Sequence, residues 1–544
     1  MYSSVQQEEH DGTFEAYKGR PRGLSMPKHI VRRPLHLLAA VSVTARVSIV
    51  LALVMIISLL FRATPHHVWS DDVPSTNSNF FHLIIPATNG GVRFCKTLFS
   101  AAVLDYPTPI VINWAGNDEK AKRGDIYGGT HTAKVSGILR YLDSLGPESD
   151  QELVLIVDGY DLWFQLPPSV LLDRYQRAIA QANARLRRRL GDAADKADIR
   201  QTIIVAAGKV CWPQSPDSPT CSLLPESELA PDTYDDPDDN ELKDIRARWL
   251  NSGFIMGPAV DVRRVMKRAE QVILADQWAF SDQMAFNEIF AQQEYQRELL
   301  RMKHLSSVQK LVGRVNKYFG LEDQRSKLIA ETNATAIGID PAVTNQTYEY
   351  HLGLDYTGGI THTLDGEYYK LRWLTFSKLE DPAELAKLPH PERVDQHFLE
   401  KDIAGSALPF SVIGDNDTAL SSQQWNEVPL WTEMYSAVVP ATFHMNRPKA
   451  PIESEWSRTW FYPHLRKHLR ARILAPRTPV AVTTDLHGQR QWWSPVTSKG
   501  GVMAETATTP TWLGWDQLCG AENEGWDELF SDKQGKWVDP RAAV

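Results

Sequence analysis

An apolar run that ends in two aspartates is the part of this sequence best suited to chemistry. Residues 153–163 read LVLIVDGYDLW, so Asp158 and Asp161 directly follow a five-residue apolar stretch. Such a stretch, rich in valine and isoleucine, is typical of a buried strand in a parallel sheet. Ligands of open α/β sheets bind at the carboxyl ends of these strands. Two carboxylates at this position can hold a hard divalent cation against a diphosphate.

The same residues also have a purely structural explanation. Aspartates are common in the turn after a strand, because their side chains hydrogen-bond the neighbouring backbone. The sixteen histidines of the chain form no H-x-D pair and no H-E-x-x-H motif, so two common metal signatures are absent. Taken alone, the segment is compatible with a cation site and with a plain turn.

Strands that alternate with helices surround this segment and predict a mostly parallel α/β sheet. The expected strands are 80–88, 109–114, 153–157 and 202–207, and the expected helices are 94–104, 131–145 and 169–190. Residues 213–243, rich in proline and acid, and the irregular stretch 376–430 are expected to be insertions. The sheet should therefore place Asp158 and Asp161 at its carboxyl edge.

An acidic cluster and a tryptophan-rich segment could each bind a ligand or be purely structural. The acidic cluster 235–239 could bind calcium, but it lacks EF-hand spacing, which favours a solvated loop. Residues 471–544 are rich in proline and contain six tryptophans, and we expect them to pack as a tail on a domain formed by residues 80–470. A carbohydrate-binding surface is the alternative for these tryptophans.

The N-terminal region predicts a membrane anchor. Residues 47–61 are uncharged and apolar, and extension back to residue 37 gives 25 residues, enough to cross a bilayer. Six lysines or arginines and no acid lie between residues 18 and 33, which predicts a cytoplasmic N-terminus. A cleaved signal peptide is the rival, but the long preceding segment and the missing A-x-A site argue against it. We therefore expect a cytoplasmic tail (1–36), a transmembrane signal anchor (37–61), a stem (62–79) and a lumenal body.

Sequons and cysteines agree with a lumenal body. Asn333, Asn345 and Asn416 each begin an N-x-[ST] sequon for N-glycosylation. Cys211 and Cys221, ten residues apart, are expected to form a disulfide in an oxidising compartment, and free buried thiols are the alternative. The net charge of −9 argues against nucleic acid as a partner.

Six short blocks occur in an order that resembles a known family. They are DIYGGTHTAKVSGILRYLD (125–143), IVAAGKVCWP (204–213), WLNSGFIMG (249–257), SDQMAF (281–286), HLGLDY (351–356) and TFHMNRPK (442–449). Together with DGYD they resemble the glycosyltransferase domain of the procollagen lysyl hydroxylase and collagen glycosyltransferase family, between about residues 80 and 461. The resemblance implies a GT-A fold, a UDP-sugar donor and manganese.

The resemblance also implies a third metal ligand. The family's histidine matches His444, which joins Asp158 and Asp161, although a histidine after the apolar run VVPATF could equally be structural. Two carboxylates with one imidazole favour manganese over magnesium, because imidazole is a softer donor. These residues come from distant segments, so a GT-A-like fold should bring their binding atoms within about 5 Å of one another.

Further residues match the family's nucleotide and sugar contacts. For the nucleotide and the diphosphate, the matching residues are Thr88, Trp114, Lys134 and Tyr160. Asn251 and Asp282 are the expected catalytic residues, and Asn251 with Ser252 should shape the sugar pocket by hydrogen bonding. The family has two adjacent acids at this point, and here the first is replaced by Ser281. This change reduces a two-carboxylate arrangement to one.

The last block departs from the family as well. Arg447 replaces a glycine, and Lys449 lies one residue nearer to His444 than in the family pattern. Both cations are expected near the diphosphate. Arg447 could clamp that group directly or crowd the space that it needs.

These features predict a metal-dependent hexosyltransferase that uses a UDP-sugar and a protein or glycan acceptor. It would be a single-pass type II protein of the Golgi or endoplasmic reticulum membrane. The chain lacks the H-x-D pair of an iron hydroxylase, so hydroxylation is not expected. The alternative is a non-catalytic glycan- or partner-binding protein derived from such a transferase, which the changes at Ser281 and Arg447 favour. A D-x-D-x-T phosphohydrolase does not fit the spacing of the two aspartates.

Overall fold

The computed structural model describes most of the chain after the predicted stem. The described residues are 80–116, 129–234, 245–275, 281–321, 323–343, 346–365, 371–388, 398–409, 422–446, 454–485, 488–505, 509–520 and 523–543. The chain divides into two units, 1–71 and 72–544, and the described residues belong to the second. Outside them lie the predicted tail, anchor and stem, Asn345, Asn416, the acidic cluster 235–239, Arg447 and Lys449. Among the residues described, no helix combines the length and the apolarity that crossing a bilayer requires.

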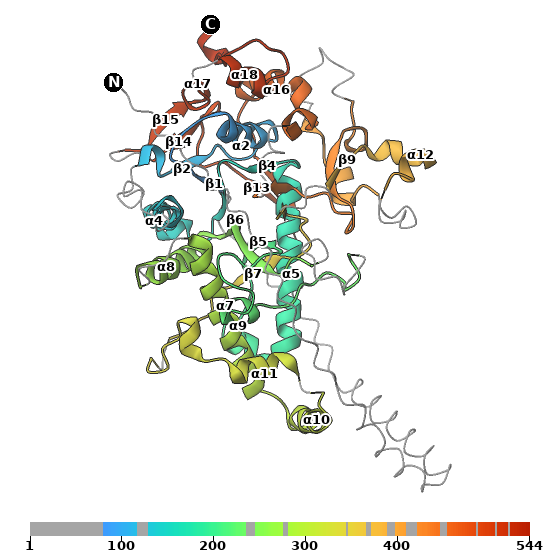
Figure 1. The fold of residues 1–544 in the computed structure, drawn as a ribbon. Coiled ribbons are helices and arrows are strands. Elements are labelled where there is room, and N and C mark those ends of the chain that lie inside the picture. Colours follow the sequence, from blue (N-terminus) through green and yellow to red (C-terminus); the bar gives the residue numbers. More distant parts are fainter. Residues whose placement is uncertain are drawn as a thin grey trace. The chain divides into compact units, whose positions relative to one another are not determined.

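An eight-stranded sheet forms the centre of this unit (Figure 1). In spatial order its strands are β15 (Thr511–Gly514), β14 (Gly501–Ala504), β2 (Ile110–Ile112), β1 (Phe81–Pro86), β3 (Leu153–Val157), β6 (Trp249–Pro258), β5 (Ile203–Gly208) and β7 (Leu352–Asp355). In this sheet β6 and β15 run against the direction of the other strands. The sheet is therefore mostly parallel, as the sequence predicts.

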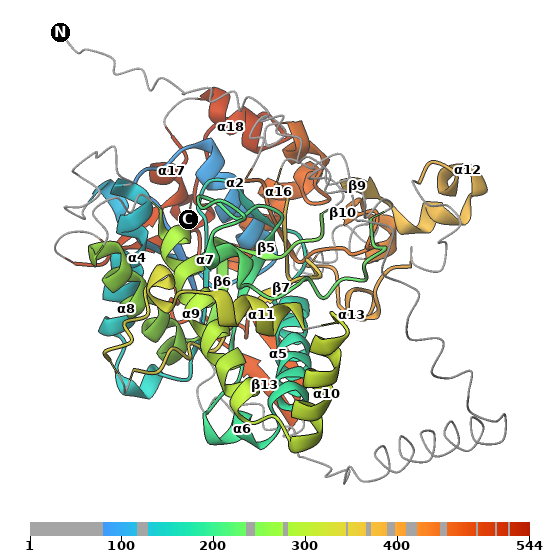
Figure 2. The ribbon, with the colours of Figure 1, turned by 60° about the horizontal axis from the view of Figure 1, so that its bottom comes forward.

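Helices cover both faces of the sheet (Figure 2). The apolar side chains of the sheet are divided between two cores, one on each face. The covering helices are α2 (Val92–Val103), α5 (Pro168–Leu190), α16 (Leu465–Leu474), α4 (Gly129–Ser144), α8 (Ala259–Ala275) and α9 (Asp282–Lys303). Leu83 and Ile85 of β1 pack in the core with α2, α5 and α16. Ile84, between them, packs in the core with α4, α8 and α9. The strands are continuous apolar runs because both of their faces are buried.

Smaller elements complete the unit. A three-stranded sheet consists of β4 (Leu162–Phe164), β11 (Thr442–His444) and β8 (Thr361–Thr363). Two further antiparallel pairs consist of β9 (Leu371–Leu374) with β10 (Leu430–Glu433) and of β12 (Ala481–Asp485) with β13 (Gly488–Trp492). Short helices interrupt the stretches expected to be irregular: α7 (Pro219–Ser222), α12 (Pro382–Leu385) and α13 (Lys401–Ala404). Helices α10 (Ser307–Tyr318) and α11 (Gln324–Glu331) follow α9.

The C-terminal segment is built into the main sheet. β14 pairs in parallel with β2, and β15 pairs with β14. Helices α17 (Trp515–Leu518) and α18 (Asn523–Leu529) follow them. Four of the six tryptophans are buried, which removes them from any sugar-binding surface: Trp492, Trp515, Trp526 and Trp537. The segment therefore contributes strands and core residues in addition to packing on the domain.

Two disulfides join the four cysteines. The Cys211–Cys221 bridge confirms the predicted pairing. The second bridge joins Cys95 in α2 to Cys519 after α17, a pairing that the sequence did not predict. No free cysteine remains, and this composition suits an oxidising compartment.

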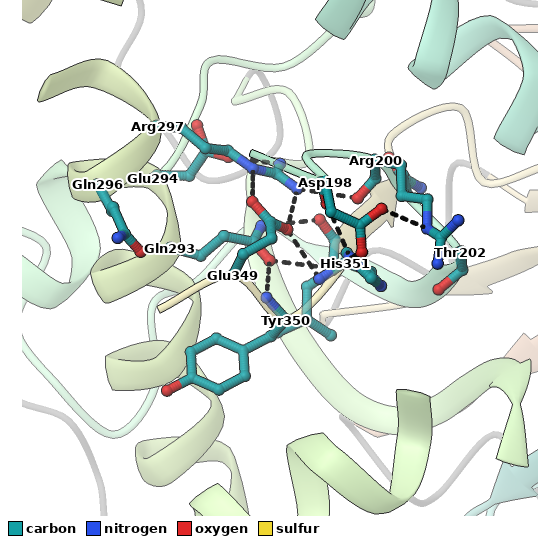
Figure 3. Close-up of polar contacts among 12 residues, drawn as sticks. Asp198, Arg200, Thr202, Gln293, Glu294, Gln296, Arg297, Glu349, Tyr350 and His351 are labelled. Carbon is teal, nitrogen blue, oxygen red and sulfur yellow. Dashed lines mark hydrogen bonds and ion pairs between the residues drawn. The ribbon is translucent and has the colours of Figure 1, made fainter. Parts of the chain in front are cut away.

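A buried polar cluster fixes the amino ends of β5 and β7 (Figure 3). Nδ1 of His351 lies 3.1 Å from Oδ1 of Asp261. Arg297 of α9 donates two hydrogen bonds to the carboxylate of Glu349, at 2.6 and 2.7 Å. Because β5 and β7 run in the same direction as β3, this cluster lies at the opposite end of the sheet from Asp158. Its groups are therefore structural and separate from the candidate site.

Candidate metal centre

The candidate metal centre begins where the chain leaves the main sheet for the three-stranded sheet. Asp158 follows β3, and its backbone N–H donates to the carbonyl of Gly253 at 3.0 Å. Leu162, directly after Asp161, begins β4 and pairs with His444 at the end of β11. Strand pairing therefore places the histidine beside the second aspartate, although the two are far apart in the chain.

The three expected metal ligands converge. One ligand atom from each of Asp158, Asp161 and His444 lies within 4.8 Å of the other two. Nε2 of His444 is 3.2 Å from Oδ1 of Asp161 and 3.6 Å from Oδ2 of Asp158. Asp161 and His444 are buried, whereas Asp158 is half-buried. The predicted convergence is confirmed, and the cluster could hold a metal ion.

Asn251 determines which nitrogen of His444 faces the aspartates. Oδ1 of Asn251 accepts a hydrogen bond from the backbone N–H of Gly253 at 3.0 Å, which identifies this atom as the oxygen of the amide. The same oxygen lies 3.1 Å from Nδ1 of His444, so Nδ1 must carry a proton and donate it. Nε2 is then the nitrogen whose lone pair is available to a cation, because a hydrogen bond to the other ring nitrogen commonly fixes the tautomer of a metal-binding histidine.

A bulge in β6 creates this arrangement. β5 pairs Val205 with Ile255 but Ala206 with Asn251, so residues 252–254 have no counterparts in β5. Bulges re-aim side chains and are common next to active sites. A Cβ atom at Gly253 would lie 2.2 Å from Cε1 of the His444 ring, so glycine is required for the imidazole to approach this closely.

Lys134 of α4 links the metal centre to α9. Its Nζ donates to Oδ1 of Asp158 at 2.7 Å and to the carbonyl of Ser252 at 2.9 Å, and it lies 3.2 Å from Oδ2 of Asp282. Burial alone lowers the pKa of the Lys134 ammonium, but Asp158 and Asp282 outweigh burial and raise that pKa above its ordinary value. Asp158 thus gives one oxygen to Lys134 and directs the other toward His444.

Aromatic side chains lie at the carboxyl ends of β1 and β2, close to the two aspartates. The hydroxyl of Tyr160 is 3.2 Å from the backbone nitrogens of Thr88 and Asn89. The ring of Phe94 contacts both Tyr160 and Trp114, each at a centroid distance of 5.9 Å. Thr88, Trp114 and Tyr160, which the sequence predicted together, are therefore neighbours, and all three are half-buried.

The sequence reasoning missed two residues that support the loop after His444. Asn446 accepts from the backbone N–H of Asp365 at 2.9 Å and donates back to its carboxylate at 2.7 Å. The backbone N–H of Lys209 also donates to Asp365, at 2.6 Å. Burial raises the pKa of the Asp365 carboxyl, although these hydrogen bonds oppose the shift. An aspartate directly after the strand-like run THTL was the signal that could have indicated it.

Ser281, which stands where the resembled family has an acid, lies at the start of α9. The side chain of Ser281 is the N-cap of α9 and accepts from the backbone N–H of Gln283 at 3.2 Å. Asp282 is buried and faces Lys134, as described above. Gln283, which the sequence did not single out, accepts from the backbone N–H of Ser252 at 3.3 Å and donates to the carbonyl of Trp212 at 2.9 Å. Gln283 therefore joins α9 to the bulge of β6, while Asp282 joins α9 to Lys134 of α4.

No family model matches this chain, and no curated protein matches it in sequence. What the site can do is therefore inferred from its own residues.

Proposed function

We propose that this protein is a metal-dependent glycosyltransferase that moves a hexose from a UDP-sugar to a protein or glycan acceptor. The observation that carries the proposal is the convergence of Asp158, Asp161 and His444 at the carboxyl edge of a mostly parallel sheet. Carboxyl edges of such sheets are where nucleotides bind. The D-x-x-D segment after β3 and the small sheet that returns His444 to it support a GT-A-like fold.

The donor set fits a divalent cation of intermediate hardness. Asp158 and Asp161 offer carboxylate oxygens, and Asn251 leaves Nε2 of His444 available as the third donor. Mixed oxygen and imidazole donors favour manganese over magnesium and calcium, which prefer oxygen alone. A cation bound here would offset the negative charge of the UDP leaving group.

Other residues have roles that follow from their positions. The Lys134 ammonium provides a fixed positive charge beside Asp158, which suits a diphosphate. The half-buried rings of Trp114 and Tyr160 flank Phe94 and suit stacking against a uracil. Asn251 uses its oxygen on His444, so we assign it to positioning the metal ligand.

The setting of the site supports a secretory location. Both disulfides lie in the described unit, and the sequon asparagine Asn333 caps a short helix at its surface. We therefore propose a Golgi or endoplasmic reticulum membrane protein whose catalytic domain is lumenal and whose anchor is residues 37–61. Endoglycosidase digestion should increase the gel mobility of the wild type but not of a variant that lacks all three sequons. A wild-type band that never shifts would contradict the lumenal placement.

A screen of UDP-sugars for manganese-dependent release of UDP tests the catalytic proposal. We expect release by the wild type, and a loss greater than about 100-fold in Asp158→Asn, because a carboxylate that binds the cation loses its charge. The exposed Asp217→Asn is the matched control and should keep wild-type activity. Absence of release with every UDP-sugar would contradict transferase activity.

One observation favours the alternative of a non-catalytic binding protein. Ser281 replaces an acid of the family, and its hydroxyl is used to cap α9. This alternative predicts manganese-dependent binding of a UDP-sugar without release of UDP, even with acceptors present. The same screen, combined with a binding titration, therefore separates the two functions.

A further inference from the structure

Helix α10 carries a complete apolar face that nothing in the described part of the chain covers. None of its residues is buried. Six large apolar side chains are between 46 and 85% exposed: Val308, Leu311, Val312, Val315, Tyr318 and, directly after the helix, Phe319. Positions three and four apart lie on the same side of a helix, so these residues form one stripe. We call this set the α10 stripe.

The helix is defined by its own sequence, and its exposure is unusual. The side chain of Ser306 and that of Gln309 form a capping box at its start. An amphipathic helix normally gains its stability by burying the apolar face. In Figure 1, α10 is set apart from the central sheet, beside α11. A contiguous exposed apolar surface of this kind marks an interaction site.

The charges beside the stripe indicate what it contacts. α10 contains Lys310, Arg314 and Lys317 and no acid, and no acid occurs anywhere between residues 299 and 321. The whole chain has a net charge of −9, so this basic region runs against the average. A helix with an apolar stripe and cations on its polar side is typical of segments that lie in the interface of a bilayer.

A second copy of the chain fits these observations less well. A 12-residue helix is about 18 Å long, so two stripes packed together would bury far less than the roughly 1,000 Å² of a specific interface. The cations of both copies would also approach and repel one another. A bilayer needs no shape complementarity, and anionic headgroups attract the cations on the polar side of the helix.

We propose that α10 is a membrane-contact helix that inserts the α10 stripe into the headgroup region of a bilayer containing anionic lipid. The proposal goes beyond sugar transfer and does not depend on it.

Site-specific fluorescence tests the proposal on the full chain. All native cysteines are in disulfides, so Val312→Cys can be labelled alone with an environment-sensitive dye. The labelled protein is reconstituted in nanodiscs of phosphatidylcholine, with or without phosphatidylserine. We expect a several-fold increase in emission with phosphatidylserine. A label at Leu274→Cys, an apolar position on α8 that is 66% exposed against 49% for Val312, is the matched control and should not respond.

Charge and apolar variants separate the possible causes. Neutralisation of Lys310, Arg314 and Lys317 to Gln should remove the phosphatidylserine response, and Leu311→Ser with Val315→Ser should remove it as well. Because these side chains are exposed, the variants should keep the wild-type circular dichroism. A Val312 label that stays in water on phosphatidylserine nanodiscs would overturn the proposal. Emission that rises with the number of copies per disc, without dependence on lipid, would assign the stripe to self-association and also overturn it.

Discussion

The oxygen of Asn251 accepts the Nδ1 proton of His444 at 3.1 Å, and Nε2 of the same ring therefore faces Asp161 at 3.2 Å. This contact selects the tautomer and the orientation of the only imidazole in the cluster. It also connects the bulge of β6 with β11, two segments that belong to different sheets. The geometry of the metal centre thus depends on a residue that is not itself a metal ligand.

Replacement of Asn251 should weaken metal binding without removing a ligand. Asn251→Leu cannot accept the Nδ1 proton, so the imidazole loses its fixed tautomer and its orientation. We expect manganese affinity to fall by about 10- to 100-fold, the usual effect of removing the residue that hydrogen-bonds a metal-binding histidine. Asn251→Asp keeps the acceptor and should lose much less. Equal manganese affinities of wild type and Asn251→Leu, measured by calorimetry, would refute the orienting role.

A methyl group at Gly253 should disturb the same histidine. In Gly253→Ala the new Cβ would lie 2.2 Å from Cε1 of His444, so the ring must move away from the aspartates. We expect weakened manganese binding and a stability loss of about 1–3 kcal/mol from overpacking. Gly313→Ala is the matched control, because no atom lies within 4 Å of its new Cβ. Replacement of a helical glycine should raise stability slightly in that control, by about 0.5–1 kcal/mol. Chemical denaturation measures both changes.

Lys134 should stabilise the metal-free protein by balancing two carboxylates. Lys134→Met leaves Asp158 and Asp282 without their shared cation. We expect a loss of about 2–4 kcal/mol in the free energy of unfolding. This loss is somewhat smaller than the loss on breaking a fully buried ion pair, because Asp158 is half-buried. Manganese should restore part of this loss in the variant. The exposed Lys327→Met is the control and should change stability by less than about 0.5 kcal/mol. Equal losses with and without manganese would argue against a shared site.

His468 in α16 should make the fold sensitive to mild acid. Burial, assisted by the nearby charges of Arg472, His464 and Lys467, lowers the pKa of His468 to about 3. The unfolded chain binds this proton near pH 6.5, so stability is present above that pH and is lost as the pH falls below it. We expect a loss of about 2 kcal/mol between pH 7.5 and pH 5 from this residue. His468→Leu should remove that part of the pH dependence. An identical pH dependence in the two proteins, measured by urea denaturation, would contradict the assignment.

The sequence identified the parts of the fold that have local signals. The apolar run 153–157 predicted β3 and its position before the aspartates, because a strand buried on both faces has no polar alternation. The sequence did not predict β14 and β15, because these four-residue strands lie inside a proline- and tryptophan-rich segment. It also missed the Cys95–Cys519 bridge, because nothing near either cysteine specifies a partner so distant in the chain.

The sequence predicted the metal ligands of the site but not the contact that orients one of them. His444 was found through the resemblance of its block, since its pairing with Leu162 is a non-local contact that no local pattern encodes. The hydrogen bond between Asn251 and His444 depends on a three-residue bulge in β6, and the periodicity of a sequence cannot reveal a bulge. Asn251 was therefore expected at the sugar, whereas the structure places its oxygen on the histidine.

Calorimetric titration of UDP tests the central claim most directly. If Asp158, Asp161 and His444 hold a cation against the diphosphate, UDP should bind to the wild type with manganese and lose most of its affinity when EDTA removes the metal. His444→Ala should abolish the manganese-dependent part and keep the wild-type circular dichroism, and Asp217→Asn should bind like the wild type. UDP that binds equally well with and without manganese, or equally well to His444→Ala, would contradict the account.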